Sequence, residues 1–293
     1  MNLFKRPRLQ RNRKLLSISR IRNISVLSQN IPGRPQPQLQ QQTKLKITDI
    51  DPVRRRNIPS PNSSAVARSV TFFERANKKF EFAIRQKSDI QHASVPIIGF
   101  MGRTNTGKTT LLKQLLTSKS QPLNQIDKLI APRNRPGSTD EIRFYTLRSN
   151  LKSSLGSSIL LADFPGYGHG SSDLQGDVIH QFIQSSLTIR VVYLLVDPYL
   201  LVQELDLLVL EMLNEFNIPW QIIVTKCDKL GTADRTLAAL DLAESFAVEK
   251  TLPISKSTRA MENKKYEVIM TSSKTNFGIP ELKYSILSNC KLI

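Results

Sequence analysis

A short polar loop between two glycines has the residue types needed to bind phosphate groups. It follows the apolar run 95–100, and residues 109–116 then have helical spacing. Between a strand and a helix, the backbone NH groups of such a loop and the helix N-terminus surround phosphates. Lys108 would reach the β- and γ-phosphate oxygens, and the Thr109 hydroxyl would ligate Mg²⁺. The predicted nucleotide-binding residues are Gly102, Arg103, Thr104, Asn105, Thr106, Gly107, Lys108, Thr109 and Thr110.

A turn-prone segment comes next and leads into residues 141–147, which alternate like a strand. A loop threonine at this point can close over Mg²⁺ and the γ-phosphate, ordered with GTP and released after hydrolysis. Thr139 is the candidate, both as a catalytic residue and as a metal ligand, although an ordinary hairpin turn also fits this segment taken alone. The predicted nucleotide contacts here are Pro136, Gly137, Ser138 and Thr139.

A carboxylate then stands at the end of a third apolar run, residues 158–161. Asp163 would reach Mg²⁺ through water. Gly166 can offer its backbone NH to the γ-phosphate, because it has no side chain to block a close approach. Gly166 is therefore a predicted catalytic residue together with Lys108. The predicted contacts of this segment are Asp163, Phe164, Pro165 and Gly166.

The strongest specificity signal is a carboxylate that follows the apolar run 221–224. Asp228 can accept hydrogen bonds from both the ring NH and the exocyclic amine of guanine, and adenine has no such donor pair, so GTP is favoured over ATP. Backbone NH groups after residues 268–270 could contact the guanine O6. The predicted contacts of these two segments are Thr225, Lys226, Asp228, Thr271, Ser272 and Ser273. Five such motifs in order predict a GTPase.

From about Phe72 to the C-terminus the chain resembles the EngB (YihA/YsxC) family of Era-like translational GTPases. Five segments carry the resemblance. GRTNTGKTT is similar to the family's GRSNVGKSS, RPGSTDEIRFY to its PGKTQ-I-N-F-F, and DFPGYGHG to its DLPGYGYA. TKCDKL is similar to the family's TKADKL, and TSSKTNFGIPEL to its SSLKKTGIDEL. The resemblance implies a GTP-controlled role in assembling the large ribosomal subunit. Ser138 and Asp140 replace a lysine and a glutamine of the family pattern, which leaves the contacts of that segment open.

Two loop positions bear on the hydrolysis of GTP. Tyr167 stands where Ras-type switches carry a glutamine that orients the attacking water, and tyrosine has no amide to do so. We therefore predict slow intrinsic hydrolysis, with water as nucleophile and a ribosomal partner as activator. Asn105 occupies a position that in related GTPases helps to hold K⁺; the alternative is that it satisfies the loop backbone.

The net charge of +18 is concentrated near the N-terminus. Residues 1–48 hold eleven Lys and Arg and no acidic residue, with Ser, Leu and Ile interleaved. This pattern predicts a mitochondrial presequence over 1–30 and location in the matrix; the alternative is a basic arm that binds RNA phosphates. Residues 31–65, rich in Pro, Gln, Asn and Ser, are predicted to be a disordered linker, and 66–293 the GTPase domain.

Strands alternate with helices, which predicts the α/β fold of a P-loop NTPase: a mostly parallel, twisted sheet with helices on both faces. A short polar connection makes the second and third strands an antiparallel pair at an edge. Phe72, Phe73, Phe80 and Phe82 suggest a helix that packs on the sheet, with RNA stacking as the alternative. The predicted strands are 95–100, 141–147, 158–163, 190–196, 220–225 and 266–271, and the predicted helices 73–86, 108–118, 173–188, 202–216, 233–249 and 279–289.

The partners expected from the resemblance are the mitochondrial large ribosomal subunit, through rRNA or ribosomal proteins. Two alternatives stay open: a GTP-dependent regulator of mitochondrial translation or mRNA binding with little turnover, and an RNA-binding protein with a vestigial GTPase fold. No apolar run reaches eighteen residues, so no membrane insertion is expected, and we expect a monomer. Cys227 and Cys290 form no metal-binding pattern and are expected to be reduced thiols.

Overall fold

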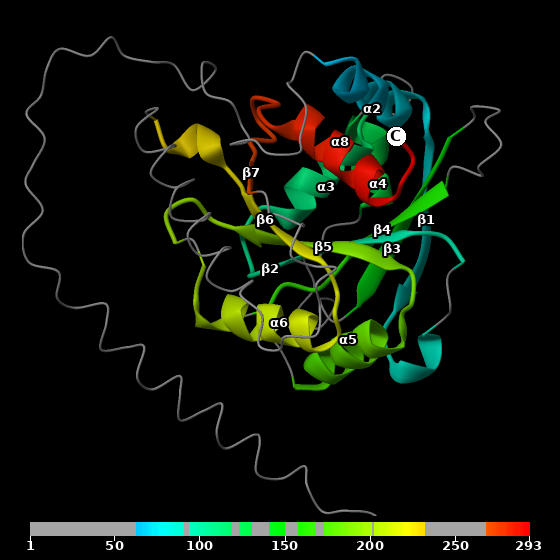
Figure 1. Cartoon of the computed structure of the whole chain (residues 1–293), viewed down its shortest axis with the longest axis vertical. Helices are drawn as coiled ribbons and strands as arrows, with labels where there is room; N and C mark the ends of the chain where they lie inside the picture. The colour runs from blue at the N-terminus through cyan, green and yellow to red at the C-terminus, as the bar shows by residue number, and fades with distance from the viewer. Residues whose placement is uncertain are drawn as a thin grey trace, which may run out of the picture. The chain divides into compact units, whose positions relative to one another are not determined.

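The computed structural model describes residues 63–90, 94–118, 123–130, 141–149, 158–167, 173–200, 202–231 and 268–293 (Figure 1). The helices are α2 (Ser64–Arg75), α3 (Lys108–Leu116), α4 (Leu123–Leu129), α5 (Asp173–Ser185), α6 (Glu204–Glu215) and α8 (Ile279–Asn289), and the 3₁₀ helices are η2 (Lys87–Asp89) and η3 (Cys227–Lys229). The strands are β1 (Asn77–Ile84), β2 (Ile97–Gly102), β3 (Ile142–Arg148), β4 (Ser158–Asp163), β5 (Ile189–Val196), β6 (Trp220–Val224) and β7 (Ile269–Met270).

Several predicted segments lie outside the described residues. These are the presequence 1–30, nearly all of the linker 31–65, the nucleotide contacts 136–139 and the helix 233–249. Within the described ranges the other predicted strands and helices are found, with ends shifted by a few residues, except the helix 73–86. The sequence analysis misses α4, η2 and η3, because each is too short to show a helical repeat.

A seven-stranded sheet has the order β1-β3-β4-β2-β5-β6-β7. Strand β2 lies between β4 and β5 and is parallel to both, and β6 and β7 continue the parallel part. Strand β3 is antiparallel to both of its neighbours. The mostly parallel α/β sheet is thus confirmed, as is the antiparallel pairing of β3 with β4. The prediction that this pair forms an edge is wrong, because β1 adds a strand outside β3.

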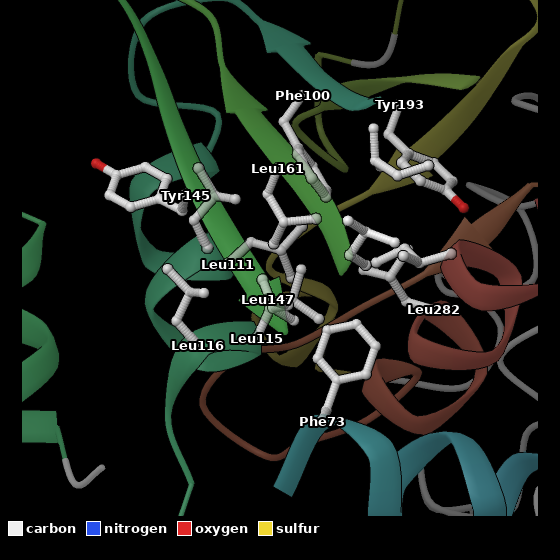
Figure 2. Close-up of a cluster of buried hydrophobic side chains, with 14 of the residues drawn as sticks. Phe73, Phe100, Leu111, Leu115, Leu116, Tyr145, Leu147, Leu161, Tyr193 and Leu282 are labelled. Carbon is white, nitrogen blue, oxygen red and sulfur yellow. The ribbon is translucent and has the colours of Figure 1, made fainter. Parts of the chain in front are cut away.

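Helices cover both faces of the sheet, as predicted (Figure 1). On one face α5 and α6 contribute Phe182 and Leu210 to a core that includes Phe144 of β3. On the other face α2, α3, α4 and α8 pack over a second core, where Figure 2 shows Phe73 of α2 near Leu282 of α8. Both faces of the parallel strands are therefore buried, as such sheets require. None of the helices in the described ranges has the length and apolar character needed to span a membrane.

Residues 77–84 form a strand, so the prediction of a helix over 73–86 is wrong. The helix lies earlier in the chain, where the Ser63 hydroxyl accepts the backbone NH of Val66 at 3.2 Å and caps the first turn. It ends at Arg75, and β1 then extends along β3. Two of the four phenylalanines expected on one helix therefore belong to a strand.

A β-bulge explains why the alternation of β1 is hard to recognise in the sequence. Phe80 pairs with Tyr145 and Phe82 with Phe144, so the register shifts between the two phenylalanines. Since Tyr145 and Phe144 are successive on β3, their side chains lie on opposite faces of the sheet. Phe82 stacks on Phe144 with ring centroids 4.5 Å apart, whereas Phe80 meets Tyr145 edge to face and is 43% exposed.

We expect Phe82→Ala to lower the free energy of unfolding by about 2–3 kcal/mol, because it removes a partly buried ring that stacks on Phe144. Phe80→Ala is the matched control, with an expected loss of about 1 kcal/mol or less, since that residue is exposed and its ring meets Tyr145 only edge to face. Urea denaturation of both variants measures the difference. Equal losses would contradict the placement of the two rings on opposite faces.

Candidate nucleotide-binding site

The motifs that the structure describes lie at the ends of neighbouring parallel strands. Arg103 follows β2, Asp163 ends β4, Thr225 follows β6 and Thr271 follows β7. Strands β2 and β4 pair so that Phe100 lies opposite Asp163. Because parallel strands run in the same direction, these carboxyl ends meet along one edge of the sheet, where open α/β sheets bind ligands.

The glycines of the loop are required by its close packing. A Cβ atom on Gly102 would lie 2.7 Å from the Leu195 carbonyl oxygen and 2.8 Å from Thr106 Oγ1. Gly107, which precedes α3, has a φ of 91°, and Asn105 has a φ of 66°, so both adopt the left-handed conformation. The loop is closed by the Thr106 hydroxyl, which donates to the Arg103 carbonyl at 2.8 Å. It leads directly into the N-terminus of α3, where the first NH groups of a helix have no partner within the helix and where Thr109 and Thr110 lie.

Lys108 and Asp163 form a buried ion pair at the centre of the site. The Lys108 Nζ lies 3.3 Å from Asp163 Oδ1, and the two side chains are 7% and 1% exposed. The loop after β2 supplies the lysine and the end of β4 supplies the carboxylate, so the pair joins two of the predicted motifs. An ammonium group in this place can bind phosphate oxygens, and a carboxylate beside it can hold a water on a divalent cation.

The base motif is fixed to the phosphate loop by two hydrogen bonds. The Thr225 hydroxyl donates to the Thr106 carbonyl at 2.6 Å. Lys226 has a φ of 53°, and its ammonium donates to the Asn105 carbonyl while it pairs with Asp197 at 3.2 Å. Both contacts use backbone carbonyls of the loop, so the base motif and the loop are held in one arrangement.

Asp228 is oriented by a serine from the last motif. The Ser272 hydroxyl donates to Asp228 Oδ1 at 2.6 Å. This side-chain role of Ser272 was not predicted: the sequence places both motifs on the guanine base, but no pattern in it shows a contact between side chains that are 44 residues apart. The half-buried carboxylate is therefore held by one hydrogen bond on the side of β7, which fixes its orientation toward a base.

Two of the three backbone NH groups predicted to contact guanine O6 form hydrogen bonds within the protein. The Thr271 NH donates to the Val224 carbonyl at 2.7 Å, and the Ser272 NH donates to the Phe277 carbonyl at 2.9 Å. Both groups hold the end of the sheet together. Of the three predicted residues, Ser273 is thus the candidate that contacts the base through its NH.

The cysteine of the base motif has a structural role. Cys227 is fully buried, and its NH donates to the Thr271 carbonyl at 3.1 Å. Burial raises the pKa of its thiol to about 12, so the thiol stays protonated at neutral pH and is a poor nucleophile or metal ligand. Cys227 and Cys290 are both free thiols, as expected.

The segment after β4 turns its bulky side chains away from the loop. Phe164 and Pro165 are buried, and Phe164 packs beside Phe182 of α5, so these two residues position the segment. Gly166 lies against the loop, since a Cβ atom on it would be 3.3 Å from both Cα and N of Thr104. A side chain here would push the backbone away from the phosphate loop by a few tenths of an ångström, so glycine is the residue that fits this approach.

Asp206, for which no role was predicted from the sequence, completes this part of the site. The Tyr167 hydroxyl donates to Asp206 Oδ1 at 2.6 Å, and the Arg103 Nε lies 3.3 Å from Asp206 Oδ2. Asp206 also closes a capping box with Gln203 at the start of α6. The spacing of Gln203 and Asp206 is a signal that could have located the helix start, though not the contact with Tyr167.

We expect Asp228→Asn to weaken GDP binding by about 100-fold, because two charge-assisted hydrogen bonds to guanine would be lost. A xanthine nucleotide, which carries a carbonyl in place of the exocyclic amine, should gain affinity for the amide. Equilibrium titration with fluorescent GDP and xanthosine diphosphate measures both changes. Asp127→Asn, on the exposed ion pair with Lys113, is the control and should change neither affinity. Unaltered GDP binding by Asp228→Asn would refute the assignment of the base site.

Comparison with known proteins agrees with this site. A family model described as a 50S ribosome-binding GTPase matches residues 97–226, which include the phosphate loop and the first two residues of the base motif, Thr225 and Lys226. The probable GTP-binding protein EngB of Rhodopseudomonas palustris is 29% identical over 195 residues, which are 65% of this chain and 78% of that protein. 

Two solved structures have a similar fold. That of a probable GTP-binding protein EngB matches 67% of this chain and 98% of its own, with a TM-score of 0.44 and 22% identity. The translation elongation factor SelB of Methanococcus maripaludis, in complex with a GTP analogue, matches 69% of this chain with a TM-score of 0.44 and 22% identity, and this chain spans 35% of that longer protein. The motifs, their convergence and the matching family model together show a P-loop GTPase domain, and the chain is similar in sequence to the EngB proteins.

Proposed function

We propose that this GTPase is a slow, GTP-gated switch in the assembly of the mitochondrial large ribosomal subunit. The observation that carries the proposal is the convergence of phosphate loop, Asp163, Gly166 and base motif at one edge of the sheet. Here the contacts of Thr225 and Lys226 with the loop keep base and phosphate recognition in one unit. A site of this kind can report whether a γ-phosphate is present, which is what a nucleotide-gated switch requires.

Hydrolysis would use water as the nucleophile, with no protein side chain as general base. Lys108 and the loop NH groups would stabilise charge on the transferring phosphoryl group. Gly166 would bind the γ-phosphate through its NH, and Thr139, outside the described residues, would close over it. The Tyr167 hydroxyl donates to Asp206, so it does not orient water. Slow intrinsic turnover follows, and a ribosomal partner would accelerate it.

Mg²⁺ fits the donor set of the site. Thr109 offers a hydroxyl and Asp163 a carboxylate, which are the hard oxygen ligands that Mg²⁺ prefers. In the described part of the chain no group of three or more His, Cys, Asp or Glu could hold a metal ion by itself. Mg²⁺ is commonly held by one or two protein ligands together with substrate phosphates and water, so it does not need such a group. When bound, Mg²⁺ would offset the charge of the β- and γ-phosphates. Asn105, exposed on the loop, is the residue through which K⁺ would add to this charge.

The cellular part of the proposal rests on composition and on the family. The description of the matching family model names 50S ribosome binding, which supports the large ribosomal subunit as partner, through rRNA or ribosomal proteins. The acid-free stretch with eleven basic residues before Asp49 supports import into the mitochondrial matrix. The chain would act there as a monomer.

Single-turnover hydrolysis tests the enzymatic part. We expect a rate for the free protein of the order that Ras shows without its activator, about 10⁻⁴ to 10⁻³ s⁻¹, and a rise of at least about tenfold on addition of large ribosomal subunits. Lys108→Ala should abolish turnover in both conditions. A rate that large subunits leave unchanged would refute the proposed activation and favour a regulator that barely turns over.

Co-sedimentation tests the switch itself. The protein without residues 1–60, in which the basic arm cannot bind RNA, should co-sediment with mitochondrial large subunits in a non-hydrolysable GTP analogue and not in GDP. Asp228→Asn should lose this binding, since it cannot hold the guanine nucleotide. Equal retention in the two nucleotides, or retention in neither, would contradict GTP gating.

A further inference from the structure

A buried carboxylate on α6 connects two parts of the nucleotide site to the start of that helix. Asp206 is fully buried, and its Oδ1 accepts the Tyr167 hydroxyl at 2.6 Å. Its Oδ2 accepts the Gln203 NH at 2.8 Å and lies 3.3 Å from the Arg103 Nε. Arg103 belongs to the phosphate loop and Tyr167 directly follows Gly166. Asp206 therefore joins the phosphate loop, the segment after β4 that carries Gly166 and Tyr167, and the start of a helix.

The hydrogen bond from Tyr167 to Asp206 is of the strong kind. A bond to a charged acceptor is about twice as strong as one between neutral groups, and burial keeps water from competing for it. Burial and the negative charge of Asp206 raise the pKa of the Tyr167 phenol far above its usual range. The phenol thus keeps its proton and remains the donor at every physiological pH.

The backbone on either side of this side chain is held against the phosphate loop. The Thr104 NH donates to the Tyr167 carbonyl at 3.1 Å, and Arg103 and Tyr167 form a parallel bridge. Gly166 packs on Thr104 so closely that a Cβ atom would be 3.3 Å from its Cα and N. The segment is therefore attached to the loop at its backbone and to α6 at its side chain, and Gly166 lies between the two attachments.

We propose that the hydrogen bond between Asp206 and the Tyr167 hydroxyl, called the latch below, holds Gly166 where its NH recognises the γ-phosphate. The latch would thereby set the affinity for GTP relative to that for GDP. The inference rests on the proposed function, because it needs Gly166 to contact the γ-phosphate. Both residues are positioning residues, since they act through Gly166. The α- and β-phosphates are bound by the loop and α3, so loss of the latch affects only the nucleotide that carries a third phosphate.

Tyr167→Phe in the full-length chain tests the latch, because it removes one hydroxyl and keeps the ring. We expect the affinity for a non-hydrolysable GTP analogue to fall by about 10- to 100-fold, the size expected for a hydrogen bond to a charged group, and the affinity for GDP to change by less than about twofold. Titration with the fluorescent forms of both nucleotides gives the ratio of the dissociation constant for GDP to that for the GTP analogue, which Tyr167→Phe should lower. Asp206→Asn should lower the same ratio, and the double variant should lower it no further than the larger single effect.

Tyr193→Phe is the matched control. Its hydroxyl is hydrogen-bonded to Ser285 Oγ at 2.7 Å in the core between β5 and α8, on no segment of the nucleotide site. It should lower thermal stability about as much as Tyr167→Phe and leave the ratio unchanged. An unchanged ratio in Tyr167→Phe, an equal shift in Tyr193→Phe, or additive effects in the double variant would each overturn the latch. Equal co-sedimentation of the wild-type chain with large subunits in both nucleotides would refute the gating itself, before any variant is compared.

Discussion

The buried pair of Lys108 and Asp163 is the interaction on which the rest of the site depends. Placing an ammonium and a carboxylate at 7% and 1% exposure removes both from water, and such pairs often stabilise a fold less than apolar residues of the same size would. Stability alone does not explain why a core position holds two charges. Phosphates and a divalent cation do, because each would meet one of these charges in place of water. The parallel register of β2 and β4 is what brings the two together.

A second constraint is that the base motif and the phosphate loop must keep a fixed arrangement, so that they bind the base and the phosphates of one nucleotide together. The base motif has no side chain of its own on the phosphates, yet Thr225 and Lys226 are hydrogen-bonded to carbonyls of the phosphate loop. The stem of Lys226 also covers Gly107, since a Cβ atom on that glycine would be 3.5 Å from Lys226 Cε. Motifs more than a hundred residues apart in the sequence thus move as one body, so that guanine recognition fixes the position of the phosphates.

The sequence predicts best those features that depend on backbone geometry. Gly102 and Gly166 are recognisable because glycine fits such close approach, and the buried parallel strands because they are continuous apolar runs. It fails where a contact joins distant segments. The hydroxyl of Ser272 on Asp228 and the carboxylate of Asp206 on Tyr167 leave no local pattern. Strand β1 was mistaken for helix because its bulge breaks the alternation on which strand prediction depends.

The residue after Gly166 bears on two properties, the orientation of the attacking water and the position of Gly166. A glutamine at this place would leave its amide free for the attacking water, whereas Tyr167 gives its only polar group to a buried carboxylate. In the proposed switch the cost would be slow chemistry, because Tyr167 would not orient water. The gain would be a fixed Gly166 that recognises a bound γ-phosphate. A partner that supplied a further group to the transferring phosphoryl would then set the lifetime of the GTP state.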